Sequence, residues 1–228
     1  MSLRLLPFRQ YDEQDVINLF ALQTDQALAA TTDDGLGSNG VFVSVSTGNF
    51  NSDVVSYGTD SYLGKEDYSH VGAGMYPSNP RTVTAAGSGI APLGITLNQT
   101  AKNDENGEKL LYNPTKKEEL QAVLPGQTVP ILTRGIVTLS ERAFDTADTM
   151  SSSTFASAFP VGGGIRISDV AAGATNAGTV TGESLDLGLD VERRDDIFGK
   201  IIGTGSRAGQ AGITDQFEGR YIVVQFSC

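Results

Sequence analysis

The stretch LPGQTVPILTRGIVTLS, residues 124–140, has the clearest alternation of turn and strand signals in the chain. It opens with Pro125-Gly126, a pair typical of a tight turn because proline fixes its own φ and glycine accepts a positive φ. Residues 129–132, VPIL, then predict a short strand. Pro130 confines that strand to a sheet edge, or stands at a strand start, because proline has no N–H for a ladder.

The second half of the stretch predicts a change of direction. Arg134-Gly135 breaks or bulges the first strand, and residues 136–139, IVTL, resume with β-branched side chains. We therefore expect two extended pieces that meet at a glycine corner, as closed or sandwiched sheets require.

The composition favours the same architecture along the whole chain. The 228 residues include 27 glycines, 8 prolines and no tryptophan, which favours many short strands joined by tight turns over a helical protein. We predict a mostly β protein, a β-barrel or a β-sandwich with long glycine-rich loops. Further strands are expected at residues 16–22, 41–45, 81–85, 90–97, 109–112, 165–167 and 221–226.

A few segments depart from this β pattern. One short helix is predicted near residues 115–122, where Thr115 can cap the first turn and Glu118 follows three residues later. Residues 46–80 and 141–160 are expected to be long loops. Residues 1–15 are expected to be an edge strand packed on its own core or an extended N-terminal arm on a partner protein. Residues 16–228 are then expected to form a single β-rich domain.

Charge and segment composition narrow the classes of partner. The chain has 16 Lys and Arg against 27 Asp and Glu, a formal net charge of −11, which argues against binding to a phosphate backbone. No window approaches the roughly 18 apolar residues that cross a bilayer, so no membrane partner is expected. Cys228 is the only cysteine, and residues 1–10 do not form a secretory signal, so we expect synthesis in a reducing cytoplasm.

Motifs for catalysis or metal binding are weak throughout. The only histidine, His70, stands beside Ser69 without the signature of an activated nucleophile. Arg193 and Arg194 lie among the carboxylates of residues 186–196. This mixture of charges favours a solvated or partner-facing charged surface over a cluster that chelates a metal ion. We therefore expect no enzyme activity, no cofactor and no metal, although a catalytic carboxylate pair stays open because only separation in space defines one.

The candidate contact residues are apolar and aromatic side chains in the N-terminal segment and the two long loops. Tyrosine combines apolar area with a hydrogen-bonding tip and suits a partner surface, although these side chains could equally pin the loops to the domain. The residues are Leu3, Leu5, Leu6, Phe8, Tyr11, Tyr57, Tyr62, Tyr68, Phe155 and Phe159.

Three blocks of sequence carry a resemblance to a known family. They are LLPFRQYDEQDVINLFAL at 5–22, PGQTVPILTRGIVTL at 125–139, and the ending FGKIIGTGSRAG at 198–209 with EGRYIVVQF at 218–226. Together they resemble capsid decoration or cement proteins of tailed marine bacteriophages. The resemblance covers about half the chain, and it lies in the general character of these blocks and not in a diagnostic motif.

The resemblance implies a non-enzymatic protein on the outer surface of the virion. Such a protein binds the icosahedral capsid, usually as a homotrimer, and clamps adjacent major capsid proteins. Two alternatives stay open from the residues themselves. One is a tail or fibre-associated module that binds a host through the tyrosine-bearing loop, and the other is a carboxylate enzyme acting on polysaccharide.

Overall fold

The computed structural model describes residues 4–22, 39–49, 81–100, 108, 110–123, 128–144, 152–169, 178–183, 196–207 and 219–228. These residues form a mostly β structure with only two short α-helices. The predicted fold class is therefore confirmed. No helix in this part of the chain is long and apolar enough to span a membrane.

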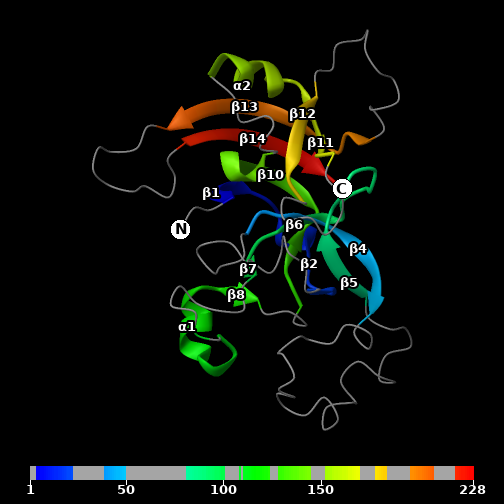
Figure 1. Cartoon of the computed structure of the whole chain (residues 1–228), viewed down its shortest axis with the longest axis vertical. Coiled ribbons are helices and arrows are strands. Elements are labelled where there is room, and N and C mark those ends of the chain that lie inside the picture. The colour runs from blue at the N-terminus through cyan, green and yellow to red at the C-terminus, as the bar shows by residue number, and fades with distance from the viewer. Residues whose placement is uncertain are drawn as a thin grey trace.

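Sheet A contains six strands, and every neighbouring pair in it is antiparallel. It forms the upper half of the molecule in Figure 1. In spatial order its strands are β1 (Leu5–Gln10), β10 (Arg134–Ser140), β14 (Gly219–Ser227), β13 (Gly199–Arg207), β11 (Gly164–Ile167) and β12 (Val180–Glu183).

Sheet B also has six strands, and it differs from sheet A in one parallel pair, β3 with β5. In spatial order its strands are β2 (Val16–Ile17), β9 (Ile131–Leu132), β6 (Gly94–Thr96), β4 (Phe42–Asn49), β5 (Arg81–Ala85) and β3 (Ala21–Leu22). A separate parallel pair joins β7 (Gln99–Thr100) to β8 (Ala122–Val123). Both six-stranded sheets have edge strands in the described part of the chain, so a sandwich describes the architecture better than a closed barrel.

The chain passes from sheet B to sheet A at Thr133. The strand before it, β9, pairs with β2 and β6, whereas the strand after it, β10, pairs with β1 and β14. Both the N–H and the hydroxyl of Thr133 donate to the carbonyl oxygen of Asp15 at 2.9 Å, and its own carbonyl accepts from the N–H of Cys228 at 2.9 Å.

The predicted pair of extended pieces is thus observed, but the predicted glycine corner is wrong. The change of sheet lies at Thr133, and Arg134 and Gly135 pair regularly with β14 inside β10. Pro130 directly precedes β9, which has a neighbour on each side, so of the two expected places for this proline the strand start is the observed one.

The main core lies between the two sheets. Leu5, Leu139 and Ile222 are successive cross-strand partners in sheet A, and all three are buried. Phe42 of sheet B packs in the same cluster, with its ring centroid 5.6 Å from that of Phe226 in an edge-to-face arrangement. The inward-facing side chains of both sheets therefore share one apolar interior, as sheet-on-sheet packing requires.

Sheet B contributes to a second apolar cluster. Along its strands, residues of this cluster alternate with residues of the main core. Val41 and Val43 belong to this cluster, whereas Phe42 between them belongs to the main core. Ile131 and Leu132 divide between the clusters in the same way. Because successive strand residues point to opposite faces, both faces of this sheet are covered, which explains the continuous apolar run at residues 41–43.

Helix α1 (Pro114–Glu119) confirms the predicted short helix, but its cap differs. Asn113 is the N-cap, and its side-chain oxygen accepts a hydrogen bond from the N–H of Lys116 at 3.3 Å. The expected Thr115 cap is wrong. Pro114 takes the first helical position, so the N-cap is the residue directly before it. The strand predicted at 109–112 is also wrong, because the 3-10 helix η2 (Leu110–Tyr112) leads directly into α1.

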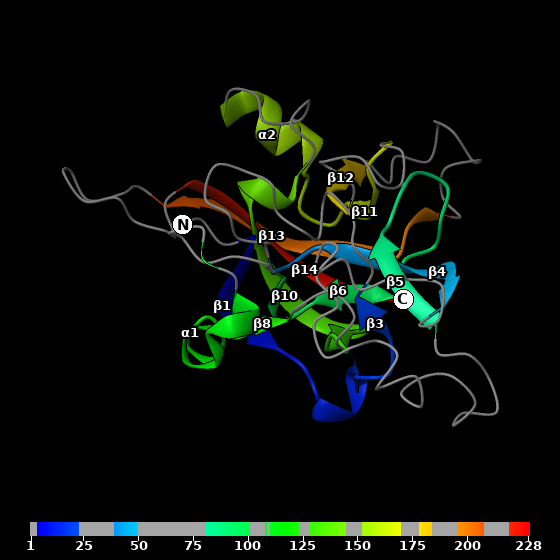
Figure 2. The ribbon, with the colours of Figure 1, turned by 60° about the horizontal axis from the view of Figure 1, so that its bottom comes forward.

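The loop predicted over residues 141–160 contains two helices. The 3-10 helix η3 (Glu141–Ala143) continues from β10, and α2 (Ser152–Ala158) precedes a turn at Phe159. The expectation that phenylalanines anchor this segment is confirmed: Phe144, Phe155 and Phe159 are buried, with ring centroids 4.6–5.7 Å apart. Figure 2 shows α2 and α1 at opposite ends of the molecule, as Figure 1 does.

The N-terminal segment is an edge strand in residues 5–10, where β1 pairs with β10. The 3-10 helix η1 (Glu13–Asp15) then leads into sheet B. The single strand expected at 16–22 is divided into β2 and β3, because residues 18–20 leave the ladder and Leu19 is exposed.

Candidate functional site

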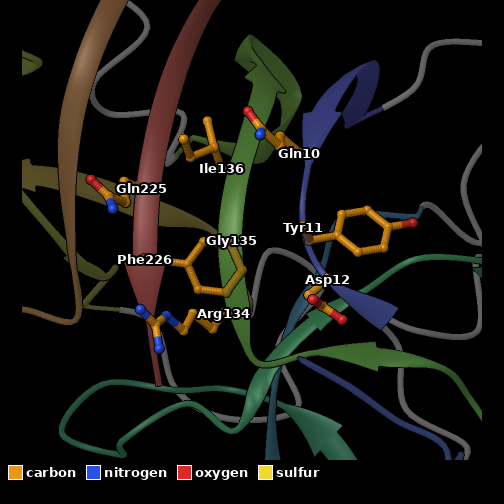
Figure 3. Close-up of a pocket in the computed structure, with 8 residues that line it drawn as sticks. All are labelled: Gln10, Tyr11, Asp12, Arg134, Gly135, Ile136, Gln225 and Phe226. Atoms are coloured by element: carbon orange, nitrogen blue, oxygen red, sulfur yellow. The ribbon is translucent and has the colours of Figure 1, made fainter. Parts of the chain in front are cut away.

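A surface hollow lies where β1, β10 and β14 meet at one end of sheet A (Figure 3). Its volume is about 360 Å³ and it opens widely to solvent. The lining residues come from all three strands and the turn after β1: Gln10, Tyr11, Asp12, Arg134, Gly135, Ile136, Gln225 and Phe226.

The register of sheet A places these residues together. Gln10 is opposite Ile136, and Ile136 is opposite Gln225, so the three side chains form one row across three strands. Gly135 and Phe226 form the next pair, and Figure 3 shows the phenyl ring beside Gly135. Because side chains alternate along a strand, Gln225 and Phe226 point to opposite faces of β14, and the Phe226 ring belongs to the main core.

Gly135 allows the close approach of the chain after β1. A Cβ at this position would lie 2.8 Å from the Cβ of Tyr11 and 3.1 Å from the carbonyl oxygen of Gln10. Any larger residue would push Tyr11 away from β10. The glycine that the sequence indicated as a corner thus acts as a spacer between two neighbouring segments.

The polar groups of the hollow have different roles. Asp12 caps η1, because its Oδ1 accepts a hydrogen bond from the N–H of Gln14 at 3.0 Å. The guanidinium of Arg9 lies 5.9 Å from the ring centroid of Tyr11, within cation–π range. Arg134 is exposed at the mouth. Of the residues that line the hollow, Asp12 and Arg134 supply one charge of each sign, and together with the amide side chains they provide hydrogen-bond donors and acceptors suited to binding a polar surface.

The edge of sheet A beside the hollow is irregular. Leu5 pairs with Leu139 and Arg9 pairs with Val137, so the three residues between Leu5 and Arg9 are opposite the single residue Thr138 of β10. The extra residues bulge out of the ladder at Pro7 and bring Phe8 to the surface, where it is 68% exposed. A bulge and a proline both disfavour pairing of another strand with this edge.

The predicted contact residues divide into three groups. Leu5, Leu6, Phe155 and Phe159 are buried within this chain and contribute to its own packing. Phe8 is exposed and Tyr11 is half-buried, and both lie on or directly after β1. Leu3, Tyr57, Tyr62 and Tyr68 lie outside the described residues.

The hollow has no metal-binding cluster beside it in the described part of the chain. Within the described ranges, no three His, Cys, Asp or Glu side chains gather where they could hold a metal ion. His70 lies outside those ranges, as does all of the acidic segment 186–196 except Asp196.

The residues of the hollow that sequence reasoning missed are Gln10, Asp12, Arg134 and Gln225. Three of them lie on strands that are far apart in sequence, β1, β10 and β14, and only the register brings them together.

Comparison with protein-family models, with curated proteins and with solved structures gives no match for this chain.

Proposed function

We propose that this protein is a non-enzymatic structural protein of a phage head. In this proposal it binds the outer surface of the icosahedral capsid as a homotrimer and clamps adjacent major capsid proteins, which stabilises the shell. The proposal begins from the sequence resemblance described above and is supported by where the resembling blocks lie in the fold.

Those blocks supply four neighbouring strands of sheet A as well as three strands of sheet B, β2, β3 and β9. For sheet A, the first block contains β1, the second contains β10 except its last residue, and the ending contains β13 and all but the last residue of β14. In space these four strands are direct neighbours in the order β1-β10-β14-β13. Segments from both ends and the middle of the chain thus make a single antiparallel surface, which is the observation that carries the proposal.

The bulged edge of β1 favours attachment through side chains. Its irregular ladder and Pro7 disfavour strand addition, so an exposed aromatic side chain is the better anchor. Phe8 supplies that anchor, and Tyr11 with the polar hollow follows directly in sequence. A partner surface with an apolar pocket and polar rim would fit this arrangement.

The stabilisation follows from mass action. A protein that binds only the assembled lattice stabilises that lattice by RT ln(1 + [L]/Kd) at each site. A trimer that contacts several capsid subunits must lose several interfaces together before it leaves. The net charge of −11 would also make the decorated surface acidic and discourage aggregation of particles.

The test is cosedimentation of the full chain with expanded heads that lack it. We expect saturable binding and a higher temperature of head disruption. Phe8→Ser should weaken binding by about 30-fold, as expected for an aromatic hot spot worth about 2 kcal/mol. Val161→Ser is the matched control, because Val161 is 65% exposed and lies far from β1 in sequence. Failure of the unaltered chain to sediment with heads would refute the proposal.

A further inference from the structure

A second hollow lies at the end of the molecule that carries α1 and β8 (Figure 1). Its volume is about 640 Å³, and it opens widely to solvent. We call it the amide groove, because three of its lining side chains are carboxamides. It shares no lining residue with the hollow beside β1, so the two surfaces are distinct. The polar residues that line the amide groove are Asn18, Asn98, Lys117, Glu118, Gln121 and Thr128.

Backbone pairing and two hydrogen bonds fix the shape of the amide groove. The strand β7 pairs with β8 in parallel. The side-chain N–H of Asn98 donates to the carbonyl oxygen of Gln121 at 3.3 Å. On the other side, the N–H of Leu97 donates to the carbonyl oxygen of Pro130 at 3.1 Å. The groove is therefore formed by the fold itself, before any ligand arrives.

The two charged side chains of the amide groove neutralise each other. The Nζ of Lys117 lies 4.0 Å from Oε1 of Glu118. The groove therefore has no net charge with which to select an ion or a phosphate ester. None of its described lining residues is aromatic, so it offers no ring on which a nucleobase could stack. The groups that remain are carboxamides and a hydroxyl, and each of these both donates and accepts hydrogen bonds.

The apolar part of the amide groove is small and aliphatic. It consists of Ala122, Val123 and Pro130, of which the first two are buried. Aliphatic surface beside groups that donate and accept matches a sugar ring, which carries hydroxyls around its edge and C–H bonds on its faces. The groove volume also lies within the range of about 300–1,000 Å³ that small-molecule sites occupy. A short oligosaccharide therefore fits both the chemistry and the size.

Gln121 has an unusual backbone conformation for its residue type. Its φ is +49°, and in the described part of the chain it is the only residue other than glycine with a positive φ. It follows Leu120, the C-cap of α1, and its N–H donates to the carbonyl oxygen of Glu118 at 3.0 Å. Helices often end on a left-handed residue, but glycine or asparagine is the usual choice. Glutamine costs stability here, and strained backbone of this kind is commonest at functional sites.

From these features we propose that the amide groove binds a neutral oligosaccharide and that Gln121 contacts it directly. One carboxamide can accept from one sugar hydroxyl and donate to its neighbour at the same time. Each such hydrogen bond replaces one with water, so its net contribution is modest and a Kd of about 1 mM is expected. The proposal uses no residue of the β1 edge, so it does not depend on the capsid role.

The test is an NMR titration of the ¹⁵N-labelled full chain with neutral trisaccharides. The probes are maltotriose, cellotriose and triacetylchitotriose, each added up to about 20 mM, well above the expected Kd. At least one should give saturable shifts of backbone amides within residues 97–98 and 117–123. Sodium phosphate over the same range should give no saturable shifts there, because the groove carries no net charge.

Two substitutions at Gln121 separate a binding role from a structural one. Gln121→Gly removes the carboxamide and relieves the positive φ, so it should weaken binding by at least about fivefold while the thermal midpoint stays equal or rises. Gln121→Asn keeps a carboxamide on a residue type that accepts this conformation, and it should bind within about threefold of the unaltered chain. Gln14→Ala is the control, because Gln14 is exposed and lines neither hollow, and its binding should not change.

The outcomes decide the proposal in either direction. A loss of binding in Gln121→Gly without a loss of stability, together with retention in Gln121→Asn and Gln14→Ala, supports a direct contact. The proposal is overturned if none of the three trisaccharides gives saturable shifts, or if the shifts map away from the amide groove. Binding by Gln121→Gly that equals binding by the unaltered chain would also overturn it, because Gln121 would then act only as a turn residue.

Discussion

Arg166 and Asp169 form a two-point ion pair at the end of β11. The Nη1–Oδ1 distance is 2.8 Å and the Nη2–Oδ2 distance is 2.9 Å. The arginine side chain is only 9% exposed, whereas that of the aspartate is 61% exposed. Nη1 also donates to the carbonyl oxygen of Ile167 at 3.2 Å. A charge in the middle of a buried strand is thus satisfied by the residues that follow it.

Asp169→Ala should destabilise the protein, because it leaves the buried guanidinium without its carboxylate. We expect a loss of about 1–3 kcal/mol in the free energy of unfolding, measured by urea denaturation. The double variant with Arg166→Met and Asp169→Ala should lose much less free energy of unfolding than the sum of the losses in the two single variants. Strict additivity of the two changes would show that the ion pair contributes nothing.

Gly94 should not tolerate alanine. A Cβ on Gly94 would overlap the carbonyl oxygen of Leu132 on the neighbouring strand β9, and backbone cannot move aside as a flexible side chain can. Gly94→Ala should cost about 1–3 kcal/mol, as overpacked interiors do. Gly203→Ala is the matched control, because its new Cβ would meet only Val223 atoms at 3.7 Å. Equal midpoints for the two variants would contradict the described approach of β6 to β9.

The N-cap of α1 is Asn113 in the structure, whereas the sequence predicted Thr115, and two substitutions distinguish these residues. Asn113→Ala should cost about 1 kcal/mol, the usual effect of losing an N-cap side chain. Thr115→Ala should change stability by less than about 0.5 kcal/mol, because Thr115 is exposed within the helix. Thermal unfolding of both variants distinguishes the roles, and a larger effect at Thr115 would restore the cap predicted from sequence.

Cys228 should react slowly with thiol reagents while the chain is folded. Desolvation raises the pKa of its thiol from 9.0 to about 12, and the thiolate is the reactive form. At pH 8.5 the folded chain should therefore react at least tenfold more slowly with a disulfide reagent than the urea-unfolded chain.

The same shift gives a sign for the pH dependence of stability. The pKa is higher in the folded state, so the contribution of this thiol is fully present below pH 9 and is lost as the pH rises toward 12. Cys228→Ser should remove that part of the alkaline decline. Equal reaction rates in the folded and unfolded chains would disprove the shift.

The sequence predicted most of the strands because their signals are local. Residues 41–45, 81–85 and 221–226 are rich in Val, Ile, Phe and Thr, and strands β4, β5 and β14 include all of them except Val41. The two extended pieces within residues 124–140 were predicted for the same reason, although the chain changes sheet at Thr133 and not at the predicted glycine corner. A strand such as 109–112 was wrong because its few apolar residues fit equally well into a 3-10 turn before a helix.

Helix α2 was missed for an identifiable reason. Its serines and alanines carry no apolar stripe, and serine is not a strong helix former. The available signal was the spacing of Phe155 and Phe159, four residues apart, which places both rings on one helical face. The burial of these rings against Phe144 is a tertiary contact that supports a helix of weak local preference.

The hollow could not be predicted, because it depends on register. Gln10, Ile136 and Gln225 are unremarkable separately, and a shift of one residue in either pairing would turn the outer row inward. Phe8 was predicted as a contact residue, and what the structure adds is the bulge that brings it to the surface.

The proposed role places this chain in a phage head, so its most direct test is the copy number of the chain in purified virions, measured by quantitative mass spectrometry against the major capsid protein. A capsid clamp predicts hundreds of copies per particle in a fixed ratio to the major capsid protein. Absence from the particle, or only a few copies as in a tail or fibre component, would contradict the account.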